Sequence, residues 1–482
     1  MGIIDSIRML FKESAIYGVA GVLSRFIAIF LIPLYTSVLT PADYGIMGLL
    51  MSGYTLLSIF LVLNLDSATA RWFYDSDIFA ERKKTINSWV WFYQFLSLFA
   101  CIILLLTSTR ISLLWFSTPV YSLLIRIIAL TIPLISWSNV VLNILRLERK
   151  PHQALLFSLT QSFLLIGFNC LFVLYLRWSL KGIYLSQLLS AVLTGAYAVV
   201  LLRKWIAVQA IDLKRLKEML KYGLPFVPAS IAGWLIGLSG LYFLNDYCSA
   251  AEVGVYQIGV SVATGVALFT NAFQMAWGPF SFSIIQNKQA GEIYSKVNSI
   301  YIVIGGFLCM GIGLFAPELL KIFTNEQYYG AAWVIAILAY NHIFIGLTQI
   351  AGTGMAIAKK TGYWGMIYIV SALFLIALNF LLIPWWGKEG AAVASCLSQL
   401  IVPVLLFYKS QKLHYIPYEF AKPVLVFFVL LGIMVVGRIS ILGHSLYGLL
   451  LFKFFLVLCA VGLVILVFKK DMKTIVQRVR SR

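Results

Sequence analysis

Few side chains in this sequence could do chemistry within its long apolar runs, and Arg25 is the most informative of them. It lies about ten residues inside the first such run, and Gly21 and Ser24 share its face of the predicted helix. If the run crosses a membrane, an arginine at that depth costs roughly 3 kcal/mol to insert. We therefore expect Arg25 to meet water or an anionic ligand. A structural ion pair inside a helix bundle is the alternative.

Two later apolar runs each end in a strip of polar side chains that could line a water-filled cleft. In the first strip, Asn64, Ser67 and Arg71 share one helical face at spacing i, i+3 and i+7. In the second strip, Asn271 and Gln274 lie near the end of a corresponding run. We interpret the two asparagines, Arg71 and Gln274 as candidate substrate-binding residues. The alternative, which applies above all to Arg71, is that they are interfacial residues at helix ends.

Two further polar residues each have a functional and a structural interpretation. Arg126 lies near one end of its apolar run, where a long side chain could bind a ligand or extend to the membrane interface. His342 shares a helical face with Gly346 and Gln349 and could relay protons. A histidine that is hydrogen-bonded within a bundle is the commoner case. The sequence leaves both pairs of alternatives open.

The elements that must position these residues are membrane-spanning helices. The chain has 482 residues, of which 61% are hydrophobic and 11% charged, and its mean hydropathy is +0.93. Because hydrocarbon offers no partner for backbone polar groups, uncharged runs of about 20 residues must be helical. We predict an all-α integral membrane protein. Its fourteen spans are expected at roughly 16–37, 44–68, 86–107, 121–145, 152–176, 182–202, 223–245, 253–275, 297–319, 331–355, 362–384, 389–408, 422–441 and 445–468.

The sequence repeats itself on either side of a basic loop that runs from Arg203 to Lys221. The matched pairs are Tyr17-Gly18 with Tyr222-Gly223, Gly45 with Gly254, Gln161 with Ser371, Asn169 with Asn379, Gly182 with Gly390 and Ser190 with Ser398. This regular offset predicts two parallel six-helix repeats and two accessory helices. The predicted segments are 1–15 (N-terminal), 16–204 (first bundle), 205–222 (basic cytoplasmic linker), 223–408 (second bundle), 409–468 (accessory helices) and 469–482 (basic cytoplasmic tail).

The net charge of +19 is explained by membrane topology and needs no polyanionic partner. Most of the 37 Lys and Arg residues lie in the termini and in the loops on one side of the predicted spans. The positive-inside rule then places both termini in the cytoplasm, and we expect no nucleic-acid partner. The sequence has no paired carboxylates, phosphate-binding glycine loop or His/Cys/Asp cluster, and its 6 cysteines are scattered singly. It therefore predicts no enzyme, no cofactor and no metal site.

Several segments together resemble a known family. They are Tyr17-Gly18 with Arg25 and Pro33, the turn Thr40-Pro41-Ala42-Asp43-Tyr44-Gly45 and the stretch Phe273-Gln274-Met275-Ala276-Trp277-Gly278-Pro279-Phe280. In order and spacing, over nearly the full chain, they are similar to the Wzx-type polysaccharide flippases of the multidrug/oligosaccharidyl-lipid/polysaccharide (MOP) exporter superfamily. The resemblance implies a protein of the bacterial inner membrane that moves undecaprenyl-pyrophosphate-linked oligosaccharide to the periplasmic leaflet by alternating access. The product would be an O-antigen of lipopolysaccharide, a capsule or an exopolysaccharide.

The resemblance also implies that the two six-helix repeats form a V around a cleft, and it implies roles and partners. A pyrophosphate requires cationic groups within the membrane, which suits Arg25 in a cleft. Coupling to H+ or Na+ would use Asp66 or Asp246 as the titrating group, with His342 as a further candidate. A polysaccharide polymerase and a chain-length regulator would act in the same membrane.

Three other functions remain open at this stage. A MATE-like drug or cation antiporter would share the fold, but we would expect acidic residues deeper in its spans than Asp66 or Asp246. A peptidoglycan-precursor flippase would carry several cations on its first helices, whereas Arg25 stands nearly alone. An integral-membrane polysaccharide polymerase would need a catalytic acid or histidine in a sizeable outer loop, and residues 108–120 offer neither.

Overall fold

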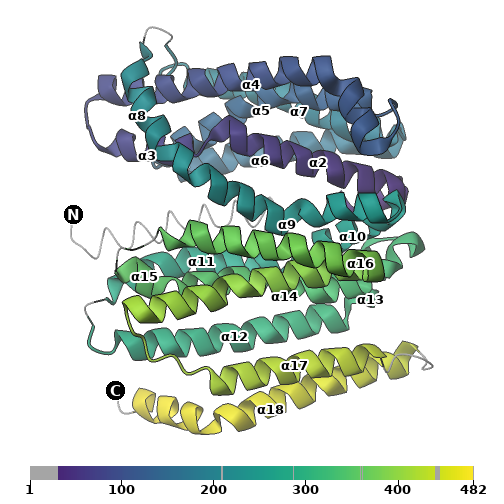
Figure 1. Cartoon of the computed structure of the whole chain (residues 1–482), viewed down its shortest axis with the longest axis vertical. Helices are drawn as coiled ribbons and strands as arrows, with labels where there is room; N and C mark the ends of the chain where they lie inside the picture. The colour runs from purple at the N-terminus through teal and green to yellow at the C-terminus, as the bar shows by residue number, and fades with distance from the viewer. Residues whose placement is uncertain are drawn as a thin grey trace. The chain divides into compact units, whose positions relative to one another are not determined.

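The computed structural model describes residues 31–207, 210–285, 287–358, 360, 362–439 and 446–480 (Figure 1). The chain divides into two compact units, Met1–Gln257 and Ile258–Arg482. In unit 1 a helical segment at 31–36 is followed by α2 (Pro41–Val62), α3 (Leu65–Tyr74), α4 (Phe79–Phe116), α5 (Ser122–Leu147), α6 (Pro151–Asn169), the π-helical turn Cys170–Tyr175, α7 (Ser179–Leu202), α8 (Leu213–Gly223), a 3-10 turn (Leu224–Phe226) and α9 (Val227–Tyr247). Helix α10 (Ala250–Ala263) begins in unit 1 and ends in unit 2.

Unit 2 continues with the helices that complete the second repeat and the accessory pair. They are α11 (Val266–Ser283), α12 (Ala290–Leu314), α13 (Ala316–Phe323), a 3-10 turn (Glu326–Ala331), α14 (Ala332–Ala351), α15 (Thr353–Ile357), α16 (Tyr363–Leu413), α17 (Ala421–Ile439) and α18 (Leu446–Arg480). Figure 1 shows α12, α14 and α17 side by side, in agreement with their contacts. In unit 1, α5 packs against both α4 and α7.

The predicted spans are confirmed in the part of the chain that the structure describes. Eleven helices are long and apolar enough to cross a membrane, or up to twelve if α10 and α11, bent by 45°, count as one span. Helix α16 is two helices joined at Gly387, where φ is 52° and ψ is −129°. With α16 counted as two spans, every predicted span after the first therefore has a helical counterpart. The first, 16–37, lies mostly outside the described residues.

Local sequence explains where α2 begins and ends. Thr40 caps the helix, since its hydroxyl accepts from the Asp43 amide at 3.2 Å and the Asp43 carboxylate accepts from the Thr40 amide at 3.1 Å. Pro41 occupies the first helical turn, where its missing N–H costs nothing. The helix ends at Leu63 and Asn64, whose φ angles of 47° and 56° are unusual for residues other than glycine. This break separates α2 from α3.

The two repeats share internal contacts as well as sequence. The Ser190 hydroxyl donates to the carbonyl of Gln161 at 3.4 Å, and the matching Ser398 carbonyl accepts from Ser371. Gly182 packs on the carbonyl of Phe172, and its counterpart packs on the carbonyl of Leu382. The intervening turns also correspond, since the backbone has positive φ at Arg177 in one repeat and at Gly387 in the other. These contacts confirm the duplication inferred from the sequence.

One part of the predicted linker is more ordered than expected. The sequence predicts a basic loop at 205–222, yet Leu213–Gly223 forms helix α8, capped by the Asp212 side chain. Its buried residues Leu216 and Met219 face the bundle, and Arg215 pairs with Glu81 of α4 at 2.9 Å. The apolar residues of this segment recur at helical spacing between the lysines, as in an amphipathic helix. The prediction of a loop took account of the basic charge and not of this period.

Candidate functional site

The first predicted polar strip lies on α3, directly after the break in the helix. Asn64 is the N-cap residue and accepts a hydrogen bond from the Ser67 hydroxyl at 3.2 Å. Asp66 follows in the first turn, and one of its carboxylate oxygens, Oδ1, is buried without a hydrogen-bond partner. The carboxylate lies close enough to Tyr93 of α4 to interact with it electrostatically. A buried carboxylate oxygen with nothing to accept from is a candidate for a proton or a cation.

Arg71 ends the strip on α3 and is held by aromatic rings. Its guanidinium carbon lies 5.4 Å from the ring centroid of Trp72 and 5.2 Å from that of Tyr222, at the end of α8. No ion pair of Arg71 occurs among the described residues, and its side chain is exposed. Cation–π contacts orient the guanidinium but leave its N–H donors available for an anionic oxygen.

The other two candidates in unit 1 lie apart from this strip. Arg126 donates from Nε to the Ser108 hydroxyl of α4 at 3.0 Å, so it joins α5 to α4. Asp246 is exposed in the last turn of α9.

Three predicted residues belong to unit 2. Asn271 donates to the carbonyl of Ala267 in its own helix, α11, and is partly exposed. Gln274 donates to the carbonyl of Ile345 in α14 at 3.4 Å. The His342 carbonyl, also in α14, accepts from the Thr270 hydroxyl at 3.0 Å, and the His342 side chain is partly buried. Asn271, Gln274 and His342 therefore lie along the packing of α11 on α14. Arg25, the remaining candidate, lies outside the described residues.

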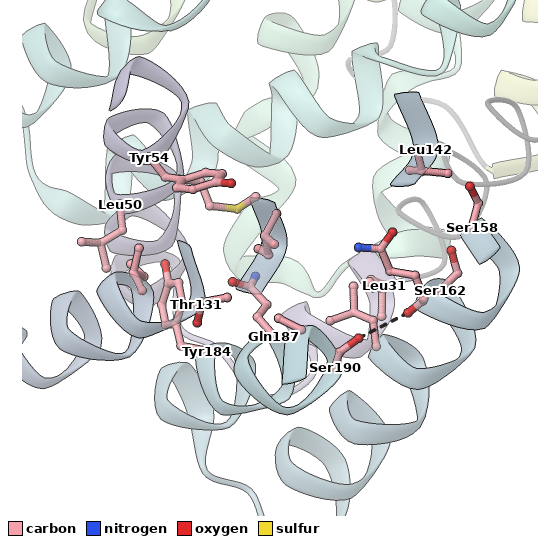
Figure 2. Close-up of a pocket in the computed structure, with 16 residues that line it drawn as sticks. Leu31, Leu50, Tyr54, Thr131, Leu142, Ser158, Ser162, Tyr184, Gln187 and Ser190 are labelled. Carbon is pink, nitrogen blue, oxygen red and sulfur yellow. Dashed lines mark hydrogen bonds between the residues drawn. The ribbon is translucent and has the colours of Figure 1, made fainter. Parts of the chain in front are cut away.

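Sequence analysis did not find the pocket within the first bundle. The pocket has a volume of about 460 Å³ and lies between the helical segment 31–36 and the helices α2, α5, α6 and α7 (Figure 2). Its lining residues are Leu31, Leu50, Met51, Tyr54, Ile128, Thr131, Ile135, Leu142, Ser158, Gln161, Ser162, Leu165, Tyr184, Gln187, Ser190 and Ala191. Figure 2 shows Ser158 and Ser162 on one helix and Tyr184, Gln187 and Ser190 on its neighbour, with side chains turned toward the same space.

A signal for this pocket was present in the sequence. Ser158, Gln161 and Ser162 lie at i, i+3 and i+4, which puts three polar groups on one face of an otherwise apolar span. In the sequence, Gln161 is noted only as the repeat counterpart of Ser371. Its backbone carbonyl does accept from Ser190, but its side chain lines the cavity.

A comparison with known families identifies the class of protein. A family profile described as "Polysaccharide biosynthesis protein" matches residues 10–285, which is more than half of the chain. The chain belongs to the polysaccharide biosynthesis protein family.

Curated relatives have names consistent with this family. The chain is 25% identical over 197 residues to the "Probable low-salt glycan biosynthesis flippase Agl15" of Haloferax volcanii, covering 40% of this chain and 41% of the relative. It is 22% identical over 253 residues to the "Capsular polysaccharide biosynthesis protein CapF" of Staphylococcus aureus, covering 49% of this chain and 63% of the relative. The matched part is less than two thirds of the length of either relative.

Solved structures share the fold of this family member. The inward closed lipid II flippase MurJ superimposes with a TM-score of 0.73 at 14% identity, covering 94% of this chain and 98% of that one. An inward-facing multidrug resistance MATE transporter of the MOP superfamily gives 0.64 at 17% identity, covering 80% and 94%. The family profile confirms the predicted polysaccharide biosynthesis family, and these structures confirm the predicted fold of many membrane-spanning helices.

Proposed function

We propose that this protein is a flippase that moves undecaprenyl-pyrophosphate-linked oligosaccharide repeat units from the cytoplasmic to the periplasmic leaflet by alternating access. The match of residues 10–285 to the polysaccharide biosynthesis family carries the proposal. The relatives named for glycan and capsule biosynthesis, and the MOP fold, support it. The cargo would be a unit of O-antigen, capsule or exopolysaccharide, and a polymerase and a chain-length regulator in the bacterial inner membrane would use it.

The distribution of charge favours glycan cargo over the drug or cation of a MATE-like antiporter. Asp66 has a buried carboxylate oxygen without a hydrogen-bond partner, whereas the Glu318 carboxylate is paired with Lys453 at 2.6 Å. By contrast, Arg71 presents free donors that suit a pyrophosphate. A transporter of lipophilic cations would require the opposite balance.

We assign roles on this basis. In unit 1, Arg25 and Arg71 hold the pyrophosphate, and Asn64 offers hydrogen bonds to the cargo. In unit 2, Asn271 and Gln274 are further candidates for hydrogen bonds to the glycan. Asp66 is the group that couples transport to H+ or Na+, and Asp246 and His342 are secondary candidates for that role. Arg126 acts through its bond to Ser108 and steadies α5 against α4.

The decisive experiment follows the lipid-linked sugars in cells that lack the gene. The proposal expects a complete repeat unit to accumulate, accessible only from the cytoplasmic side of the membrane. The chemistry of the trapped glycan would then identify the cargo. If completed units instead reach the periplasmic face and remain unpolymerised, the proposal fails in favour of a polymerase. If no lipid-linked sugar changes, drug or ion export becomes the better explanation.

A further inference from the structure

The pocket of the first bundle has the size of a ligand site. Its volume of about 460 Å³ falls within the range of about 300–1,000 Å³ that is usual for pockets that hold a small organic molecule. The helical segment 31–36 and the helices α2, α5, α6 and α7, all of one compact unit, provide its walls. The cavity therefore lies entirely within the first helix bundle.

None of the described residues that line the pocket is charged. Asp66 and Arg71 are not among them, so the pocket is distinct from the charged strip on α3. The described residues offer no charge to compensate a pyrophosphate, a carboxylate or a cation in this space, and an uncompensated charge is costly at membrane depth. The occupant should be neutral.

The pocket nevertheless contains hydrogen-bonding groups with no intramolecular partner. The Tyr184 hydroxyl is buried and unpaired. In the described part of the chain, the side chains of Gln161, Gln187, Ser158 and Ser162 make no hydrogen bond either. Thr131, on the same wall, behaves differently, because its hydroxyl donates to the carbonyl of Ile127 at 2.7 Å. Unpaired carboxamides and hydroxyls in a membrane span call for an external partner.

The chemistry of the walls selects among neutral partners. A carboxamide both donates and accepts, as the hydroxyl and acetamido groups of a sugar require. Leu50, Ile128 and the ring of Tyr54 supply apolar surface for the C–H face of a sugar ring. A lipid tail would leave the two glutamines unpaired. Water alone would leave the apolar wall without contacts.

We propose that this pocket is a subsite for one uncharged sugar, a neutral hexose, deoxyhexose or N-acetylhexosamine, of the transported oligosaccharide. The inference rests on the proposed function, and it adds that part of cargo selection takes place inside the first bundle. The charged strip would recognise the pyrophosphate common to all such cargo, while Gln161, Gln187 and Tyr184 would read the glycan.

Ligand-observed saturation-transfer NMR on the full-length protein in nanodiscs tests the subsite directly. The probes are glucose, galactose, rhamnose, N-acetylglucosamine and N-acetylgalactosamine, with glucuronic acid as the charged comparison. We expect at least one neutral probe to bind, and Gln187→Leu and Tyr184→Phe to weaken its binding by about five- to tenfold, because each removes a hydrogen-bonding group. Matched controls, Gln153→Leu on the exposed face of α6 and Tyr197→Phe on α7, should bind as the native protein does.

The outcomes separate the subsite from the proposed function. Absence of binding by every neutral probe, equal binding of glucuronic acid, or unchanged binding by both pocket variants would each overturn the subsite. Ser162→Ala, which removes a single oxygen, serves as a third variant if either of the others fails to fold. A flipping assay in proteoliposomes with lipid-linked glycan completes the design. If flipping occurs but pocket variants alter neither its rate nor its sugar preference, the subsite fails and the flippase stands. If sugar binding depends on the pocket but no flipping occurs, the subsite stands and the flippase proposal fails.

Discussion

Gly45 of α2 and Gly254 of α10 pack backbone to backbone. A Cβ atom added to Gly45 would lie 2.9 Å from the Gly254 nitrogen, and one added to Gly254 would lie 3.0 Å from the Gly45 nitrogen. The two glycines occupy matching positions in the sequence repeat. The helices related by the duplication therefore cross at the residues that the duplication equates, and only glycine allows so close an approach.

We expect Gly254→Ala to destabilise the protein by about 1–3 kcal/mol, as overpacking does. The new Cβ would overlap the carbonyl oxygen of Pro41, which is backbone and cannot move aside easily. Thermal unfolding of the purified protein measures the effect. Gly237→Ala in α9 is the matched control, because nothing lies within 4 Å of its added Cβ. Equal melting temperatures for the two variants would show that the crossing is looser than described.

The sequence predicted the spans well because the cost of unpaired backbone groups in hydrocarbon leaves long apolar runs one conformation. The pairing of Lys453 with Glu318 could not be predicted, since 135 residues separate them. The pocket could not be predicted from the sequence for another reason. Gln187 and Tyr184 look ordinary in an apolar span, and only packing reveals that their polar atoms lack partners. Composition determines which segments are helices, whereas the site depends on which helix faces meet.

Arg25→Ala should abolish most flipping while the protein still inserts into the membrane. The expectation comes from the sequence, since Arg25 lies within the first apolar run. A charged side chain there raises the free energy of membrane insertion, so its removal should not impair insertion, and its role should lie in transport. Membrane fractionation and a flipping assay measure the two quantities. Full activity of Arg25→Lys would show that charge alone matters and that the planar guanidinium does not.

Arg71→Gln should slow flipping of pyrophosphate-linked cargo about tenfold or more, because it removes the charged donor that α3 presents. The aromatic support can be tested separately. Tyr222→Phe retains the ring that lies 5.2 Å from the guanidinium and should be nearly neutral, whereas Tyr222→Leu should reduce the rate. Flipping rates measured in proteoliposomes test both expectations. Equal rates for the native protein and Arg71→Gln would place Arg71 at a helix end with no contact to the cargo.

Asp66→Asn should make flipping insensitive to an imposed proton or sodium gradient. The variant keeps the size of the side chain and removes the charge whose buried Oδ1 has no hydrogen-bond partner. The measurement compares initial rates with and without each gradient. Asp75→Asn, at the exposed C-terminal end of α3, is the control and should retain the native response. A gradient response that survives in Asp66→Asn would transfer the coupling role to Asp246 or His342.

Lys453 and Glu318 form a partly buried ion pair that holds the accessory helix α18 to α13. The Lys453 side chain is 0% exposed, and its Nζ donates to both carboxylate oxygens of Glu318 at 2.6 and 2.7 Å. Lys453→Met should cost about 3–5 kcal/mol, because it leaves a carboxylate without its partner. Lys453→Met combined with Glu318→Gln should recover much of this loss, since neither charge of the pair remains. The double-mutant cycle, measured by thermal unfolding, isolates the pairwise term. If the two substitutions are simply additive, the accessory helix is held by apolar packing of α18 on α17 and the ion pair contributes little.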